Sequence, residues 1–227
     1  MKKAICIIPA KGHSERLPGK NMKRFFGQPI IKYAIDTARA SGLFHKVVVS
    51  TDDDKIGTAT AGMGAVYHKR GSGLAEATVP MVEVVLDALT EQRVTYEYVC
   101  MMYATNPFST VRDLVTGLDW LEQGFDVVFP AFQGPHPEHS YIKKDWRYML
   151  RYPEYEGEPS QFWPTPYHPA GQWYFADVPA LFESRSFVMP HTWCIEVPAF
   201  HAVDIDTEED WEFATVIYRY LQEKNRK

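Results

Sequence analysis

Short apolar runs alternate with longer amphipathic stretches along the first 130 residues of the chain. The runs are continuous, as in strands buried on both faces, and they predict strands over 4–8, 46–50, 65–68, 98–102 and 126–130. Between them, apolar residues recur at helical spacing, which predicts helices over 30–40, 52–61, 79–89 and 111–121. This alternation predicts an α/β fold, a three-layer α/β/α sandwich around a mostly parallel, Rossmann-like sheet.

The alternation stops at Ala131, and the segment 131–169 is rich in proline, aromatic and charged residues without a regular period. A loop of this length is either an insertion with its own role or disordered. Its many aromatic side chains favour order. We therefore predict one domain over 1–227, with 131–169 as a small inserted arm that packs on the main domain or on a second subunit.

The end of the chain predicts one more helix. Thr207 is placed to cap it, acids at 208–210 fall in its first turn, and an apolar stripe begins at Trp211. The stripe continues through Ala214 and Ile217, so one face of this helix should pack against the domain.

The 227 residues carry a formal charge of −5. This acidic balance, without a long run of like charges, argues against binding to nucleic acid or to a membrane surface. The apolar stretch after Met1 is too short for a secretion signal or a membrane span, so we expect a cytoplasmic protein. The three cysteines are widely spaced, which argues against a disulfide framework and a structural zinc site. Cys6 and Cys100 lie in apolar runs, where core packing is expected.

The loop after the first predicted strand combines glycine with positive charge. Ligands of an open parallel sheet bind beyond the carboxyl ends of the strands, so this loop is well placed. Gly12 and Gly19 permit close backbone approach, and three cations could neutralise a polyphosphate, namely Lys11, Arg16 and Lys20. The Gly-Lys pair of a Walker A loop is missing. An ordinary surface loop that carries lysines is the alternative.

Asp204 and Asp206 stand two residues apart, just before the last predicted helix. On an extended segment this spacing points both carboxylates to one side, where they could hold Mg²⁺ together with phosphate oxygens. The alternative is that both acids only favour the start of the helix, where negative charge is stabilising.

Three other motifs predict no site. The cluster at Gly71 and Gly73 lacks the third glycine of a dinucleotide-binding loop and indicates a turn. The segment 136–139 resembles a metal cluster, but a proline interrupts it and no third ligand follows at zinc spacing. Ser14 lacks the Gly-x-Ser-x-Gly context of a hydrolase nucleophile.

Taken together, four segments resemble the acylneuraminate cytidylyltransferases, the CMP-sialic acid synthetase family. The first loop, 7–21, is similar to that family's signature, and 48–53 looks like its second strand with the turn that follows. The segment 103–108 is similar to the motif after its fourth strand, and 203–207 looks like its metal-binding acidic motif. They occur in the family's order along nearly the whole chain. The segments 103–108 and 168–174 resemble the pseudaminic acid branch, because the sialic acid enzymes usually carry glutamine where this chain has Tyr103.

The resemblance implies a nucleotide-diphospho-sugar transferase fold and a reaction of CTP with a nine-carbon nonulosonic acid sugar, pseudaminic acid in this branch, to give the CMP-sugar and pyrophosphate. It implies Mg²⁺ on Asp204 and Asp206, and a homodimer in which the arm 131–169 reaches over the partner's site. Matching positions imply that the nucleotide is bound by Ala10, Lys11, Gly12, Ser14, Lys20, Asn21, Arg70 and Thr78, with Lys20, Arg16 and Asp206 catalytic. They imply a sugar pocket of Tyr103, Thr105, Asn106, His168, Gln172 and Tyr174.

Several positions depart from the family pattern. In the first loop a usual arginine is Lys11, a usual glycine is His13 and a usual basic residue is Glu15. In the arm, Pro159 stands where pseudaminic acid enzymes tend to carry arginine. The alternatives are therefore a cytidylyltransferase for legionaminic, N-acetylneuraminic or Kdo acid, and a catalytically inactive homologue that binds nucleotide or sugar.

Overall fold

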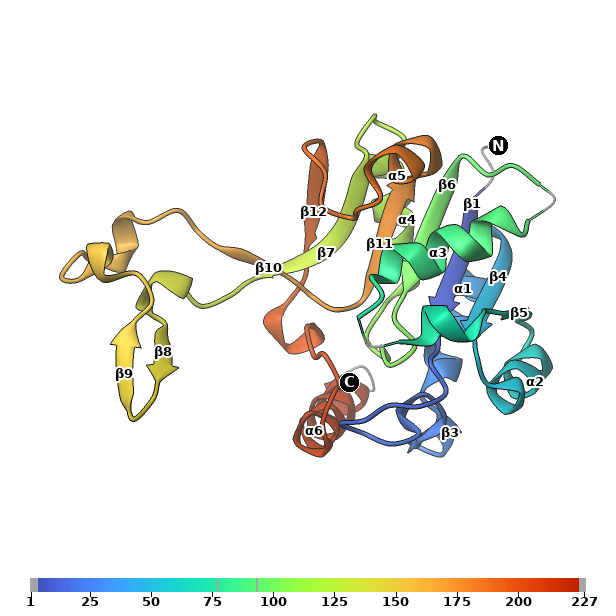
Figure 1. Cartoon of the computed structure of the whole chain (residues 1–227), viewed down its shortest axis with the longest axis horizontal. Helices are drawn as coiled ribbons and strands as arrows, with labels where there is room; N and C mark the ends of the chain where they lie inside the picture. The colour runs from blue at the N-terminus through green and yellow to red at the C-terminus, as the bar shows by residue number, and fades with distance from the viewer. Residues whose placement is uncertain (1–3, 77, 93, 225–227) are drawn as a thin grey trace.

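A central sheet organises the computed structural model, which describes residues 4–76, 78–92 and 94–224. Its strand order is β10-β7-β11-β6-β1-β4-β5, with β12 also paired to β7 (Figure 1). One direction is shared by β1 (Ala4–Pro9), β4 (Phe44–Thr51), β5 (Val66–Lys69), β6 (Tyr98–Met102), β7 (Val127–Gln133) and β12 (Thr192–Glu196). The opposite direction is taken by β10 (Tyr167–Pro169) and β11 (Trp173–Asp177). The sheet is therefore mostly parallel, as predicted.

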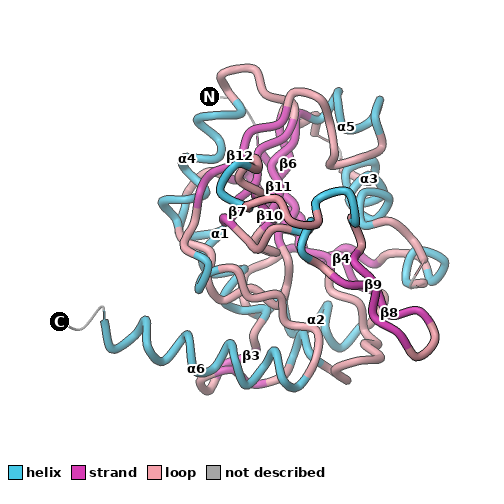
Figure 2. The backbone as a smooth tube through the Cα atoms, turned by 90° about the vertical axis from the view of Figure 1, so that its left-hand side faces the viewer, coloured by secondary structure: helices cyan, strands magenta, loops and turns pink. Residues whose placement is uncertain are grey.

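Helices cover both faces of the sheet. In Figure 2 the strands stand between α1 (Ile31–Ser41) and α4 (Val111–Leu121) on one side and α3 (Met81–Thr90) and α5 (Val178–Ser184) on the other. Alternate residues of β1 face opposite layers, since Cys6 packs with α1 and α4 while Ile5 and Ile7 pack with α3 and α5. Burial on both faces explains the continuous apolar run, and the predicted three-layer sandwich is confirmed.

The helix ends follow local capping. The side chain of Asp53 accepts hydrogen bonds from the first turn of α2 (Asp54–Gly62), Thr110 caps α4, and Gly42 ends α1 with a φ of 67°. The third helix begins later than predicted, at Met81, because Pro80 has an extended backbone, with a ψ of 142°, and stands at its N-cap.

Cys6 and Cys100 are buried and are register partners on β1 and β6. The expected core packing of both is confirmed. Burial and the neighbouring Cys6 raise the pKa of the Cys100 thiol, which keeps it protonated and unreactive.

The segment 131–169 begins and ends in the sheet, where 131–133 of β7 pair with 167–169 of β10, and the part between them projects away as an arm (Figure 1). Its far end is an antiparallel hairpin of β8 (Tyr141–Lys144) and β9 (Arg147–Leu150). The buried Trp163 packs against the rings of His136, His139 and Tyr155, so the arm has a small core of its own. Large apolar side chains on its outside remain exposed, namely Tyr141, Ile142, Trp146, Tyr148, Met149 and Phe162.

A third, smaller core lies under the last helix, α6 (Glu208–Lys224). Its Trp211 and Ala214 pack against Phe25 in the short hairpin of β2 (Arg24–Phe25) and β3 (Gln28–Pro29). The single apolar face predicted for this helix is confirmed. No helix among the described residues is long and apolar enough to cross a membrane.

Candidate active site

A cavity of about 500 Å³ opens at the carboxyl ends of β1, β5 and β6, the edge where an open α/β sheet binds its ligands. Its wall combines the first loop, the residue after β5, the segment after β6 and the acidic pair before α6. The predicted site residues in this wall are Lys11, Ser14, Arg16, Lys20, Asn21, Arg70, Tyr103, Thr105, Asp204 and Asp206. The first loop and the acidic pair, which are separated by almost the whole length of the sequence, therefore line the same cavity.

The third core explains why these two regions meet. Leu17 from the first loop is buried in the same apolar cluster as Val203 and Ile205. Because 203–206 alternates between apolar and acidic residues, burying Val203 and Ile205 turns Asp204 and Asp206 to the other side, into the cavity. The predicted same-side placement of the two carboxylates is confirmed.

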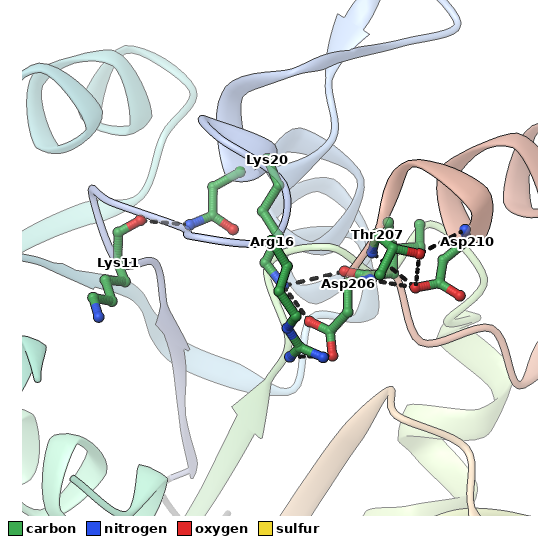
Figure 3. A network of polar contacts seen from close by, with 8 residues as sticks. Lys11, Arg16, Lys20, Asp206, Thr207 and Asp210 are labelled. Carbon is green, nitrogen blue, oxygen red and sulfur yellow. Dashed lines mark hydrogen bonds and ion pairs between the residues drawn. The ribbon is translucent and has the colours of Figure 1, made fainter. Parts of the chain in front are cut away.

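Two first-loop cations converge on Asp206. Lys20 Nζ donates to Asp206 Oδ1 at 2.9 Å and to the Ile205 carbonyl at 3.1 Å, and Arg16 donates to Asp206 Oδ2 at 2.6 Å (Figure 3). Lys20 is held more firmly, because its side chain is 21% exposed against 67% for that of Arg16. This carboxylate is the counter-ion of the two cations that are predicted to bind phosphate.

The start of α6 fixes the backbone that carries Asp206. Thr207 Oγ1 accepts from the Asp210 N–H at 3.2 Å, and Asp210 Oδ2 accepts from the N–H groups of Asp206 and Thr207 at 3.0 and 2.8 Å. This reciprocal arrangement is a capping box with Asp in place of Glu. The capping predicted for Thr207 is confirmed, and it holds the acidic pair beside the helix terminus.

Hydrogen bonds behind the cavity wall fix the backbone of the first loop. Asn21 Nδ2 donates to the Lys11 carbonyl at 2.9 Å, while the Gly12 N–H donates to Asp52 Oδ1 at 3.0 Å. A Cβ at Gly12 would lie 2.7 Å from the Cβ of Asp53. The close approach that this glycine permits is therefore to the β4–α2 turn, and its N–H is already used, which differs from the expected role of facing a phosphate.

Arg70 is a buried cation at the edge of the cavity, 5% exposed. One of its terminal nitrogens lies 3.3 Å from Asp52 Oδ1, and its Nε has no hydrogen-bond partner among the described residues. Burial alone would raise the pKa of Asp52, but the hydrogen bond from Gly12 and the charge of Arg70 outweigh it and hold the pKa below its usual value. The pair is therefore ionised at neutral pH.

The acidic pair fits a hard divalent cation. Desolvation of Asp204 by the surrounding protein atoms is the first cause that raises the pKa of its carboxyl group. The negative charge of Asp206 is the second, as expected where two carboxylates lie close together. No cluster of three or more His, Cys, Asp or Glu side chains within 4–76, 78–92 and 94–224 could hold a metal by itself. Two carboxylates suit Mg²⁺, which keeps several waters and takes its remaining ligands from substrate phosphates.

The residues predicted for the sugar pocket fall into two groups. Tyr103 and Thr105 line the cavity. Asn106 and Gln172 are buried behind it, where Asn106 Oδ1 accepts from the N–H groups of Phe108 and Ser109 at 2.8 and 3.0 Å. The Gln172 side chain donates from Nε2 to the His201 carbonyl at 3.1 Å and accepts at Oε1 from the Ser109 hydroxyl at 3.4 Å. Both side chains therefore support the wall instead of forming it.

His168 and Tyr174 lie elsewhere. His168 is on β10 at the base of the arm, with Nε2 3.2 Å from the Pro135 carbonyl and its ring against Gly134. Within this chain the structure does not bring it to the cavity. Tyr174 packs beside Tyr103, with ring centroids 6.5 Å apart, one layer behind the wall.

The cavity wall also contains residues that were not predicted from the sequence. They lie in the 3₁₀ helix Ser72–Ala75, in the segment after it and at the start of α3, and comprise Leu74, Glu76, Val79, Met81 and Val84. Thr78, predicted to bind nucleotide, is exposed next to them but outside the wall, and Ala10 is buried beneath it. The pair of glycines was the available signal, since a turn directly after a parallel strand lies at the ligand edge.

Comparisons with known proteins identify the family of the chain. Residues 5–143 match the family model described as cytidylyltransferase. The chain is 33% identical to the pseudaminic acid cytidylyltransferase of Campylobacter jejuni, over 97% of this chain and 98% of that protein. It is 25% identical to the N-acylneuraminate cytidylyltransferase of Escherichia coli, over 99% of this chain and 54% of that protein.

The fold has solved counterparts. A CMP:2-keto-3-deoxy-manno-octonic acid synthetase, solved in complex with CTP, superposes with a TM-score of 0.68 at 18% identity, over 96% of this chain and 99% of that one. At this identity the likeness concerns the fold alone. It agrees with the predicted transferase architecture. The family model, which covers more than half of the chain, and the match over nearly the whole Campylobacter protein show that the chain belongs to the cytidylyltransferase family.

Proposed function

We propose that this protein transfers CMP from CTP to the anomeric hydroxyl of a nonulosonic acid sugar, pseudaminic acid or a close relative, and releases pyrophosphate. The observation that carries the proposal is the convergence of Lys20 and Arg16 with Asp204 and Asp206 on one cavity. A triphosphate needs cations along its oxygens, and the divalent ion that accompanies it needs carboxylates. The cavity offers both.

Catalysis here is mainly positioning. The sugar hydroxyl attacks the α-phosphorus in line with the leaving pyrophosphate, a reaction that asks for alignment and charge stabilisation more than for covalent help. Lys20, held at the cavity by the Ile205 carbonyl, is suited to neutralise the leaving group, and the exposed Arg16 can follow the phosphates. When bound, Mg²⁺ would neutralise phosphate oxygens, with Asp204 and Asp206 as its protein ligands.

Arg70 supports cytosine as the base. A guanidinium only donates hydrogen bonds, and the side chain of Arg70 lines the cavity, where it can face the O2 and N3 edge of a pyrimidine. Cytosine presents two neighbouring acceptors, O2 and N3, whereas uracil replaces the N3 acceptor with an N–H donor. A buried donor that cannot be satisfied costs about 1–3 kcal/mol. Arg70 would therefore favour CTP over UTP.

Tyr103 supports a polar sugar acid as the acceptor. It lines the cavity beside the acidic pair, and burial, followed by the charges of Asp204 and Asp206, raises the pKa of its hydroxyl. The hydroxyl therefore stays protonated and can donate a hydrogen bond to the sugar. The choice of pseudaminic acid is supported by the substrate in the name of the Campylobacter protein, which matches this chain over nearly its full length.

The arm supports a homodimer. Its outer face exposes Trp146, Tyr148 and Phe162 at 78%, 68% and 78%, and apolar patches of this kind mark interaction surfaces. We propose that 131–169 of one copy lies over the cavity of the other and that His168, at its base, acts there. Because CTP is a cytoplasmic nucleotide, a cytoplasmic location follows from the proposal.

The test is turnover with a panel of acceptors. Purified protein is incubated with CTP, Mg²⁺ and, in separate reactions, pseudaminic, legionaminic, N-acetylneuraminic and Kdo acid, and pyrophosphate release is measured. We expect the highest kcat/KM with pseudaminic acid. A higher value with another acid would replace the acceptor, and CTP binding without pyrophosphate from any acid would favour the inactive homologue.

A further inference from the structure

One carboxylate oxygen joins the first loop to Arg70. We infer that Asp52 is a positioning residue that fixes these two parts of the site relative to each other and thereby sets the preference for CTP. The inference rests on the proposed function. Asp52 does not line the cavity itself, so it would act through the Gly12 backbone and the Arg70 guanidinium.

The topology places Asp52 between its two partners. Gly12 follows β1, Asp52 follows β4 and Arg70 follows β5, and these strands are neighbours in the order β1-β4-β5. The same oxygen, Asp52 Oδ1, accepts from the Gly12 N–H at 3.0 Å and lies 3.3 Å from an Arg70 terminal nitrogen. A shift of this oxygen would therefore move the loop and the arginine together.

The turn that carries Asp52 is itself rigid. The Asp53 N–H donates to Thr51 Oγ1 and the Arg70 N–H donates to the Thr51 carbonyl, both at 3.1 Å. Asp53 caps α2, and Gly12 packs so close to it that a Cβ would not fit. The backbone thus brings all three segments together, and Asp52 adds the charged contact between them.

The negative charge of Asp52 affects how Arg70 recognises the nucleotide base. A buried cation that loses its only close counter-ion becomes costly and relaxes to another arrangement. Asp52 is the one carboxylate within 4.0 Å of the Arg70 guanidinium among the described residues. Without its charge, the guanidinium would no longer be held where Arg70 lines the cavity, and discrimination between cytosine and uracil would weaken.

The neighbouring acid supplies a matched control. Asp54 is two residues away on the same turn, but its side chain is 69% exposed and pairs with Lys69 on the surface. Asp52→Asn and Asp54→Asn both remove one negative charge from this turn. Only the first removes the charge that faces Arg70, while its amide oxygen can still accept from Gly12.

We expect Asp52→Asn to raise KM for CTP roughly tenfold, the size expected for one charge-assisted hydrogen bond, with KM for the sugar acid unchanged. The ratio of kcat/KM for CTP to that for UTP should fall, which a purely structural role would not cause. Asp54→Asn should leave both quantities at the wild-type values. An unchanged CTP-to-UTP ratio in Asp52→Asn would overturn the inference.

A second variant and a direct binding measurement complete the test. In an Arg70→Ala background, Asp52→Asn should change KM for CTP much less, and an undiminished effect would overturn the inference. If Asp52→Asn does not fold, Asp52→Ser, which keeps a small oxygen acceptor, takes its place. Calorimetry with CTP separates the two hypotheses, since a wild-type protein that binds no CTP refutes the proposed function, whereas equal CTP affinity in the wild type and Asp52→Asn refutes only the role of Asp52.

Discussion

Replacing Asp206 by asparagine should have opposite effects on nucleotide binding and on turnover. Asparagine keeps the shape of the side chain but removes the charge that pairs with Lys20 and Arg16. Those two cations are then free for phosphate, while the acidic pair loses one of its two carboxylates. Asp206→Asn should therefore bind metal-free CTP more tightly than the wild type and yet fail to turn it over.

The size of the binding effect follows from the exposure of the pair. Lys20 and Asp206 are 2.9 Å apart with side chains 21% and 27% exposed, so their pair is worth about 1 kcal/mol, and the 67% exposed Arg16 adds little. Freeing Lys20 therefore tightens metal-free CTP binding about fivefold. Loss of a metal ligand costs several kcal/mol in the transition state, so kcat should fall by about 10³ or more.

Two measurements test this prediction. Calorimetry with CTP in EDTA at low salt gives the affinity, and pyrophosphate release with Mg²⁺ gives kcat. Asp36→Asn is the matched control, because it removes an equal charge from an exposed pair with Lys32 on α1, away from the cavity. Metal-free affinity no higher than that of Asp36→Asn, or turnover at the wild-type rate, would refute the reasoning.

Three further predictions concern the loop, the cap and acid stability. Lys20→Ala should raise KM for CTP far more than KM for the sugar acid in steady-state assays, and equal rises would mean that the loop is misassigned. Thr207→Ala removes the cap of α6 and should lower the free energy of unfolding in urea by about 1 kcal/mol, whereas an unchanged value would contradict the capping box. Because the pKa of Asp52 is lowered in the folded protein, its charge stabilises the fold above about pH 4, and that contribution is lost as the pH falls through the folded pKa. The difference in melting temperature between wild type and Asp52→Asn should therefore shrink from pH 7 to pH 3, and a constant difference would contradict the shift.

The elements that the sequence predicts well are those whose burial is determined by neighbours along the chain. The strand Tyr98–Met102 and the helix Val111–Leu121 match their predicted bounds, since the first is buried on both faces and the second has a capping threonine before it. The helix predicted over 30–40 likewise spans Ile31–Ser41 and is ended by Gly42.

The elements that the sequence does not predict depend on pairing with strands that are distant in the sequence. β11 is a short strand inserted antiparallel between β6 and β7, and α5, Val178–Ser184, spans too few residues to show a period. β12 is paired only to β7 among the described strands and is half-buried, so its pattern is weak. The hairpin in the arm was also missed, because β8 and β9 are exposed almost throughout and burial imposes no pattern on them.

The site divides in a similar way. Lys20 and Asp206 were predictable because each motif has its own chemistry, although only the third core shows why they meet. Asp52 was not predicted as a site residue, because its role depends on strand order and not on its own motif. His168 was assigned by resemblance, and within one chain the base of the arm holds it away from the cavity.

The central claim is that the first loop and the acidic pair bind one triphosphate. A crystal structure with Mg²⁺ and a non-hydrolysable CTP analogue tests it most directly. We predict phosphate oxygens within hydrogen-bonding distance of Lys20, the metal bound by Asp204 and Asp206, and the Lys20–Asp206 pair opened. A triphosphate bound away from this cavity, or a metal that contacts neither acid, would contradict the account.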